Sequence, residues 1–254
     1  GGSFMDVLLA RILKFLNGAL TYDDEYLFST FVVMNYMEMQ NWTLEEVVEK
    51  SGVQAEPIIA FVKKLGYRDY DAFKERLILN HMTRLDQIRA RMIGLNSADF
   101  VKDMEKDCTD EEMLEQISAM CASIDKAKRV VIIAALYPTS IGVEFQTDLV
   151  TFGKPVLSYH QFDKTWTFDE DDVVIFISAT GRARRGFMAE HEQTNIAAAQ
   201  TIMITQNPTY KVAEHKVTDY VIQVPGRFDG INFNYQLMKI FDLMRIHYYQ
   251  QYYI

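Results

Sequence analysis

Residues 172–178 read Asp-Val-Val-Ile-Phe-Ile-Ser, with five apolar side chains in succession. A strand that has one face in water alternates apolar and polar residues, so an unbroken apolar run predicts a strand buried on both faces. Four further short, largely apolar runs lie in the same half of the chain, at residues 129–135, 155–159, 201–205 and 220–224. We therefore expect five buried strands between residues 125 and 254.

Segments with helical character separate these strands, at residues 140–152, 183–199, 210–216 and 230–250. Regular alternation of strand and helix is typical of a parallel sheet with helices on both faces. The second half of the chain is thus predicted to be an α/β domain with a doubly wound, parallel, five-stranded sheet. Ligands of such sheets bind at the carboxyl ends of the strands, where the strand order reverses.

The first half of the chain shows no convincing strand. Its apolar residues recur at helical spacing, which predicts five short helices at residues 4–17, 23–38, 44–50, 55–65 and 70–79. Thr21 and Thr43 each precede a carboxylate by three residues, as in a capping box. We expect an all-α domain over residues 1–90, a helical linker over 91–124 and the α/β domain over 125–254.

Composition narrows the class of protein further. The 254 residues carry a net charge of −9, which argues against a surface that binds polyanions everywhere but allows a local basic patch. Two cysteines are too few for a disulfide framework. No apolar run is long enough to span a membrane and no signal peptide is visible. We expect a cytoplasmic protein that does not bind a membrane.

Residues 44–66 contain a short predicted helix, a turn at Gly52 and a second helix over 55–65. Glycine permits the positive φ of such a turn, and the pattern is that of a helix-turn-helix. Its second helix would be a recognition helix in a DNA major groove, or the pair would be a plain helical hairpin. The shape alone favours neither alternative.

The residues around this turn resemble the N-terminal domain of RpiR-type bacterial transcription regulators. The resemblance rests on Gly52-Val53, Phe61, Lys63-Lys64-Leu65-Gly66-Tyr67 and Tyr70-x-x-Phe73-Lys74. In that family the domain precedes a SIS (sugar isomerase) domain that senses a phosphosugar, so the resemblance covers nearly the whole chain. It implies a transcriptional regulator of carbohydrate metabolism that binds DNA and a sugar-phosphate effector, forms a homodimer or homotetramer, and uses no cofactor.

The resemblance places the DNA contacts on the second helix, at Gln54, Ala55, Glu56, Ile59, Lys63 and Lys64. The chain departs from the family at Gln54, Pro57 and Ala60, where a hydroxyl cap, a threonine and an arginine are usual. Glu56 adds a negative charge, and residues 1–85 contain nine Lys or Arg against twelve Asp or Glu. We therefore expect DNA recognition that is weakened or altered.

Residues 178–186, Ser-Ala-Thr-Gly-Arg-Ala-Arg-Arg-Gly, follow a predicted strand and open a helix. Hydroxyls, a glycine and a helix N-terminus are the elements of an anion site, although a plain capped loop is the alternative. The loop resembles the phosphate loop of SIS domains, apart from Ala183 in place of a threonine and Arg182 at a usually acidic position. The predicted phosphosugar site comprises Ser140, Ser178, Thr180, Gly181, Arg182 and Arg184.

The second sugar loop of the family has glycines where this chain has Leu136 and Pro138, which predicts an altered pocket. Residues 205–208 are interpreted as a turn. No metal motif or catalytic signature is present, so we expect a regulator rather than an enzyme. One alternative is an aldose–ketose sugar-phosphate isomerase, for which Glu144, Glu190 and His191 are the nearby acid–base candidates. Another is a regulator that has lost DNA or sugar recognition.

Overall fold

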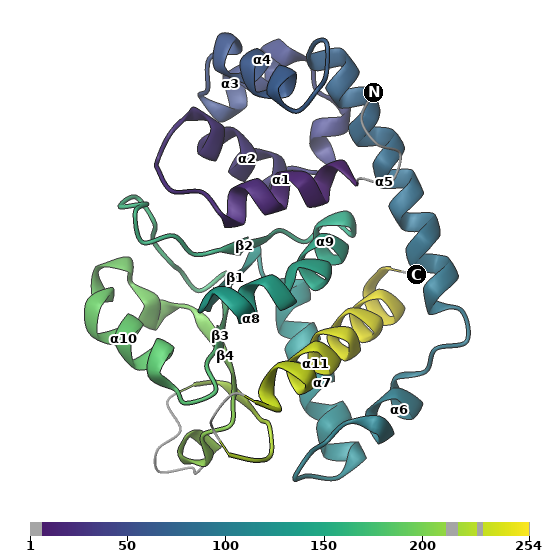
Figure 1. Ribbon diagram of the computed structural model, residues 1–254, viewed down its shortest axis with the longest axis vertical. Helices are drawn as coiled ribbons and strands as arrows, with labels where there is room; N and C mark the ends of the chain where they lie inside the picture. Colours follow the sequence, from purple (N-terminus) through teal and green to yellow (C-terminus); the bar gives the residue numbers. More distant parts are fainter. Residues whose placement is uncertain (1–6, 212–217, 228–230, 254) are drawn as a thin grey trace. The chain divides into compact units, whose positions relative to one another are not determined.

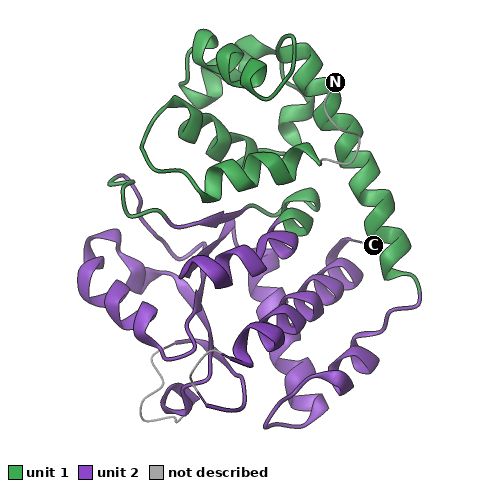
Figure 2. Ribbon diagram, in the orientation of Figure 1, with its two compact units in different colours: residues 1–93, 147–155, 160–164 green, residues 94–146, 156–159, 165–254 purple. Residues whose placement is uncertain are grey.

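The computed structural model describes residues 7–211, 218–227 and 231–253 (Figure 1). The chain divides into two compact units (Figure 2). Unit 1 consists of Gly1–Ile93, Thr147–Pro155 and His160–Lys164, and unit 2 of Gly94–Gln146, Val156–Tyr159 and Thr165–Ile254. No described helix combines the length and the apolar character that crossing a membrane requires. The predicted domain limits at residues 90 and 124 stay a prediction.

Unit 1 is built mainly from helices. They are α1 (Leu8–Asn17), α2 (Asp24–Met34), the 3-10 helix η1 (Glu38–Asn41), α3 (Leu44–Ser51), α4 (Ala55–Lys64) and α5 (Tyr70–Met92). Phe61 of α4 lies in the core between Phe15 and Phe28, with ring centroids 5.1 and 5.8 Å away. This apolar cluster fixes α4 against the first two helices.

The end of α5 differs from the prediction. The sequence predicts an end at residue 79, and this prediction is wrong, because the helix continues to Met92. Two of its later inward-facing positions hold the polar residues His81 and Arg84, which are buried nonetheless. They interrupt the apolar periodicity on which the prediction depended. The chain leaves the helix only at Ile93, just before Gly94, whose φ is +77°.

The start signals in unit 1 are confirmed in one case and wrong in the other. Thr43 accepts a hydrogen bond from the backbone N–H of Glu46, and the Glu46 carboxylate accepts one from the Thr43 N–H, which completes a capping box. Thr21 caps no helix. Its hydroxyl donates to Asp23, and Asp23 is the residue that caps α2. The α3–α4 turn passes through Gly52 at φ +74°.

Unit 2 alternates helices and strands. In chain order the elements are α6 (Ser97–Phe100), η2 (Val101–Asp103), α7 (Asp110–Lys126), β1 (Arg129–Ala134), α8 (Leu136–Ile141), α9 (Val143–Thr151), β2 (Val156–Ser158), β3 (Asp172–Ile177), α10 (Arg182–Glu190), η3 (Glu192–Thr194), η4 (Ile196–Ala198), β4 (Gln200–Thr205), η5 (Pro208–Lys211), β5 (Tyr220–Gln223), α11 (Phe233–Tyr248) and the π-helix η7 (Tyr249–Tyr253). The last five residues of α9 belong to unit 1.

All five strands form one parallel sheet in the order β2-β1-β3-β4-β5, which confirms the predicted α/β fold. Every residue of β3 is buried, as the unbroken apolar run at 172–178 predicts. Figure 1 shows α10 on one side of the strands and α8 and α11 on the other. The two layers of helices account for the burial of the central strand on both faces.

Several predicted helices of this half have different limits. The segment 140–152 is two helices separated at Gly142, and the segment 183–199 is α10 followed by two 3-10 turns. Between those turns Asn195 adopts φ +61°, which a regular helix does not allow. In the predicted helix 210–216, Tyr210 and Lys211 belong to the 3-10 helix η5, and the remaining residues lie outside the described ones.

Candidate functional site

The strand order places a switch point between β1 and β3. From β1 the chain crosses to β2 on one side, and from β3 it crosses to β4 on the other. At such a point the segments that follow the two strands diverge and leave room for a ligand at their carboxyl ends. Here those segments are α8 after β1 and residues 178–181 after β3. The predicted phosphosugar residues lie on these two segments and on the first turn of α10.

The two hydroxyls of the 178–181 loop cap α10 (Arg182–Glu190). Ser178 Oγ accepts hydrogen bonds from the N–H groups of Gly181 and Ala183, at 3.0 and 3.2 Å. Thr180 Oγ1 accepts one from the N–H of Arg182, at 3.2 Å. These N–H groups are the donors that an anion at the helix N-terminus would use. In this structure the loop therefore satisfies its own helix end, and an incoming anion would exchange with these hydroxyls.

Gly181 is essential to the shape of this loop. Its φ of +88° lies in the left-handed region that favours glycine, and a Cβ built on it would lie 2.5 Å from Cε2 of Tyr210. Tyr210 belongs to η5 and is itself buried. The aromatic ring therefore packs directly on the glycine backbone, and any other residue at position 181 would force the two apart.

The turn after β4 supports the same loop, a role that the sequence did not indicate. The side-chain amide of Asn207 donates to the carbonyl of Thr180 at 2.9 Å. The hydroxyl of Thr205 and the N–H of Gln206 both donate to the carbonyl of Ala179, at 3.2 and 3.0 Å. The sequence predicts only a turn at residues 205–208, because it is the pairing of β3 with β4 that brings them beside the loop.

The arginines of α10 have different surroundings. Arg182 is exposed, whereas Arg184 is buried with its guanidinium over the rings of Phe176 and Tyr210, 5.7 and 6.0 Å from their centroids. Burial lowers the pKa of Arg184 from its usual value. Arg185, which the sequence did not single out, is exposed and donates to the carbonyl of Thr180 and the hydroxyl of Tyr210. Arg182 and Arg185 therefore provide accessible positive charge beside the loop.

The segment after β1 is a helix rather than an open loop. Pro138 occupies the first turn of α8, where its missing N–H costs little. The exposed hydroxyl of Ser140 donates to the carbonyl of Leu136 at 3.0 Å, and Thr139 makes the same bond one residue earlier, to Ala135. Both hydroxyls thus serve the helix backbone, although each keeps accepting capacity for a ligand.

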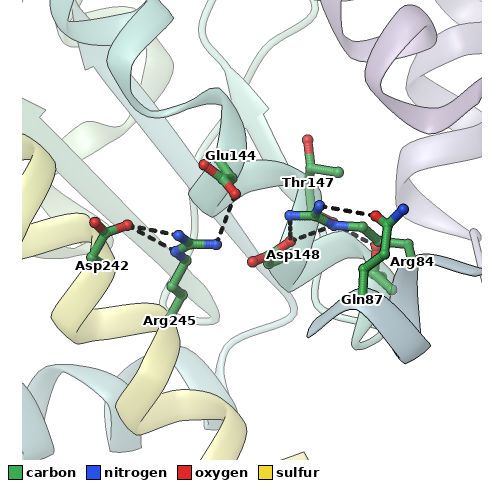
Figure 3. A network of polar contacts seen from close by, with 8 residues as sticks. Arg84, Gln87, Glu144, Thr147, Asp148, Asp242 and Arg245 are labelled. Carbon is green, nitrogen blue, oxygen red and sulfur yellow. Dashed lines mark hydrogen bonds and ion pairs between the residues drawn. The ribbon is translucent and has the colours of Figure 1, made fainter. Parts of the chain in front are cut away.

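The acid–base candidates of the isomerase alternative lie in ion pairs or at the far end of α10. Glu144 accepts a hydrogen bond from Arg245 at 3.2 Å, and Arg245 also pairs with Asp242 (Figure 3). Nδ1 of His191 lies 3.3 Å from the Tyr159 hydroxyl, at the C-terminal end of α10 next to Glu190. A helix of this length separates its ends by about 12 Å. Glu190 and His191 are therefore remote from the 178–181 loop.

The exposed face of α4 carries most of the predicted DNA contacts. Gln54 at the N-cap, Glu56, Lys63 and Lys64 are exposed. Ala55 and Ile59 are half-buried, because the opposite face of the helix packs into the core of unit 1. The face is thus available to a ligand, but its first turn presents the carboxylate of Glu56.

The cations near the end of α4 are mostly engaged. Lys64 pairs with Glu25, and Arg68 pairs with Asp69. The ammonium group of Lys74 donates to the carbonyl of Trp42 at 3.2 Å. Lys63 makes no ion pair within the described ranges. Each paired cation must release its partner before it neutralises a phosphate, which weakens the electrostatic part of DNA binding.

No protein-family model matches the chain, and no curated protein matches it. Solved structures with a similar fold include the Vibrio vulnificus NanR protein complexed with ManNAc-6P, at 11% identity over 96% of this chain and 92% of that chain, with a TM-score of 0.44. Another is a hypothetical protein from Methanococcus jannaschii described as a 3-hexulose-6-phosphate isomerase by inference, at 20% identity over 61% and 86%, with a TM-score of 0.45.

A third similar structure is the sugar isomerase domain of an RpiR transcription factor from Sphaerobacter thermophilus. It is 15% identical over 65% of this chain and 89% of that chain, with a TM-score of 0.41.

Proposed function

We propose that this chain is a DNA-binding regulator of carbohydrate metabolism whose α/β unit senses a phosphorylated sugar. The observation that carries the proposal is the 178–181 loop at the β1–β3 switch point. It joins a left-handed glycine, two hydroxyls and the N-terminus of a nine-residue helix. Arg182 and Arg185 add positive charge beside it. A phosphate monoester fits this combination, because its oxygens accept from hydroxyl, guanidinium and backbone N–H donors.

The helical unit supports the other half of the proposal. It presents the exposed face of α4 after a glycine turn, in the order that a helix-turn-helix requires. A two-fold dimer would present two such faces to a palindromic site. A sugar phosphate regulates DNA binding only if it binds one arrangement of the dimer more tightly than another.

A thermal-shift screen with sugar phosphates, with the parent sugars and with inorganic phosphate as separate arms, tests the sensor. We expect stabilisation by at least one sugar phosphate that exceeds the effect of its parent sugar. Replacing both exposed arginines, in Arg182→Gln/Arg185→Gln, should remove that stabilisation. The matched control is Arg68→Gln, an exposed arginine of unit 1 that should leave it unchanged. Arg184 is unsuitable for this test, because its burial makes any substitution a test of folding.

The engaged cations and hydroxyls favour one second candidate, a regulator that has lost DNA or sugar recognition and acts through protein contacts. Fluorescence anisotropy with a labelled DNA duplex separates the two. Binding that weakens with salt supports the regulator, whereas no binding at low salt favours the second candidate.

The thermal-shift screen also tests the isomerase alternative. If the protein converts a stabilising aldose phosphate to a ketose phosphate, NMR of the mixture would show the product.

A further inference from the structure

An exposed stripe runs along the outer face of α5 (Tyr70–Met92) in unit 1 and ends at the residue that follows the helix, Ile93. Three large apolar side chains on it are exposed, Leu79 at 52%, Met82 at 60% and Ile93 at 80%. Between them lie Asp86 and Arg89, whose side chains are 78% and 56% exposed and form an ion pair at 3.7 Å. We call these five residues the α5 stripe. Moving apolar groups of this size out of water lowers the free energy of the system.

The stripe follows the geometry of a helix-pairing seam. Its residues are spaced by three or four positions in alternation, so the four within α5 lie on one face of the helix, and Ile93 continues the spacing just after it. A different face of the same helix is buried at His81, Arg84, Leu85, Ile88 and Met92. The stripe is therefore a second, exposed side of α5 with the spacing to pair with another helix.

The charges on the stripe fit a second copy of the same stripe in antiparallel orientation. If residue numbers across the contact add to 175, Asp86 faces the partner's Arg89 and Arg89 faces the partner's Asp86. In the same register Met82 faces the partner's Ile93, and Ile93 faces the partner's Met82. These apolar pairs flank a cluster of four charges. A two-fold axis generates this self-complementary arrangement.

Two alternative arrangements bring like charges together. A parallel pair in register sets Asp86 against the partner's Asp86, and an antiparallel pair that matches Leu79 with the partner's Ile93 does the same. Like charges at such a contact are unfavourable, so the charge pattern favours the register described above over both alternatives. We propose that the α5 stripe is a contact between two copies of this chain, with α5 helices antiparallel over about 17 Å. This inference rests on the proposed function, which requires a dimer, and it specifies where that dimer forms.

Charge exchange tests the contact on the full chain by sedimentation equilibrium, without DNA or a sugar phosphate. Asp86→Arg places four positive charges at the axis and Arg89→Asp places four negative ones, so each variant alone should weaken dimerisation about tenfold. An equimolar mixture of the two should restore the dimer, because every cross-helix pair is then of opposite sign. The i, i+3 pair within each helix stays repulsive in the mixture, so rescue reports only the contact between copies.

Substitution of the apolar part gives an independent measurement. Ile93→Lys should weaken dimerisation, whereas Leu20→Lys, at a position of unit 1 that is 86% exposed and outside the stripe, should not. A monomeric wild-type chain, unchanged dimerisation in the single variants, or a mixture that does not recover would each overturn the contact. Failure of the regulator proposal is separate, since it would show as absent DNA or sugar-phosphate binding by a chain that still dimerises.

Discussion

The guanidinium of Arg84 donates two hydrogen bonds to one carboxylate oxygen of Asp148, 3.0 Å from Nε and 2.6 Å from a terminal nitrogen (Figure 3). Both side chains are buried, at 8% and 0% exposure. The pair joins α5 to the part of α9 that belongs to unit 1. Both residues of the pair lie within unit 1, so the pair stabilises that unit.

Breaking this buried pair should destabilise the protein strongly. Arg84→Met leaves the Asp148 carboxylate buried without its main cation and should lower the free energy of unfolding by about 3–5 kcal/mol. The double variant Arg84→Met/Asp148→Leu should recover most of that loss, since it removes both charges together. Urea unfolding measures both. Arg68→Met, which breaks an exposed pair with Asp69, is the control and should cost less than about 1 kcal/mol.

The two glycines of the loop–helix segment should respond in opposite directions to alanine. Gly181→Ala combines a positive φ with a collision against Tyr210, and should cost about 2 kcal/mol or more. Gly186 lies inside α10 with open space around its Cα, so Gly186→Ala should stabilise by about 0.5–1 kcal/mol. Thermal unfolding of the two variants compares them directly. Equal effects would mean that Tyr210 does not pack on Gly181 as described.

The strands were the part of the fold that sequence patterns predicted best. Each predicted strand lies within two residues of the observed one, because Val, Ile and Phe in succession have few alternatives to burial in a parallel sheet. Helix limits were less predictable. The continuation of α5 past residue 79 depends on His81 and Arg84 being buried, and their partners Thr151 and Asp148 lie 70 and 64 residues away along the chain.

The candidate site, too, was predicted only in part from the sequence. The motif at 178–181 and its position after a strand were visible in the sequence. Its support by Asn207, the packing of Tyr210 and the involvement of Arg185 were not, because they arise from the pairing of β3 with β4. One local signal for Arg185 was available, since it lies one helical turn after Gly181. The difference between Arg182 and the buried Arg184 required the surrounding aromatic rings.

A pH dependence should follow from His81. Burial lowers the pKa of His81 below its usual 6.5, and the hydrogen bond between Nε2 and the carbonyl of Thr151 only partly opposes this shift. Because the unfolded chain then binds the proton more tightly, stability should be complete above about pH 6.5 and decline as the pH falls toward the folded pKa. Burial shifts His160 and His247 in the same direction.

Urea unfolding at about pH 7.5 and pH 5.5, for the wild type and for His81→Gln, measures the contribution of this residue. The variant should lose less stability on acidification than the wild type, although the other two histidines still titrate. An NMR titration of the folded protein checks the cause, since the His81 ring should titrate below 6.5. A His81 pKa above that value would refute the explanation.

The lysines of α4 should contribute unequally to DNA binding. Lys63 has no ion pair in the described part of the chain, so Lys63→Ala should weaken binding to any duplex and reduce the salt slope by about 1. Lys64 pairs with Glu25, and Lys64→Ala should therefore cost less. Glu56→Gln removes a negative charge from the same exposed face and should raise the affinity. Anisotropy with one labelled duplex at several salt concentrations compares all three. Equal losses at Lys63 and Lys64, or binding that salt does not weaken, would contradict the assignment of this face to DNA.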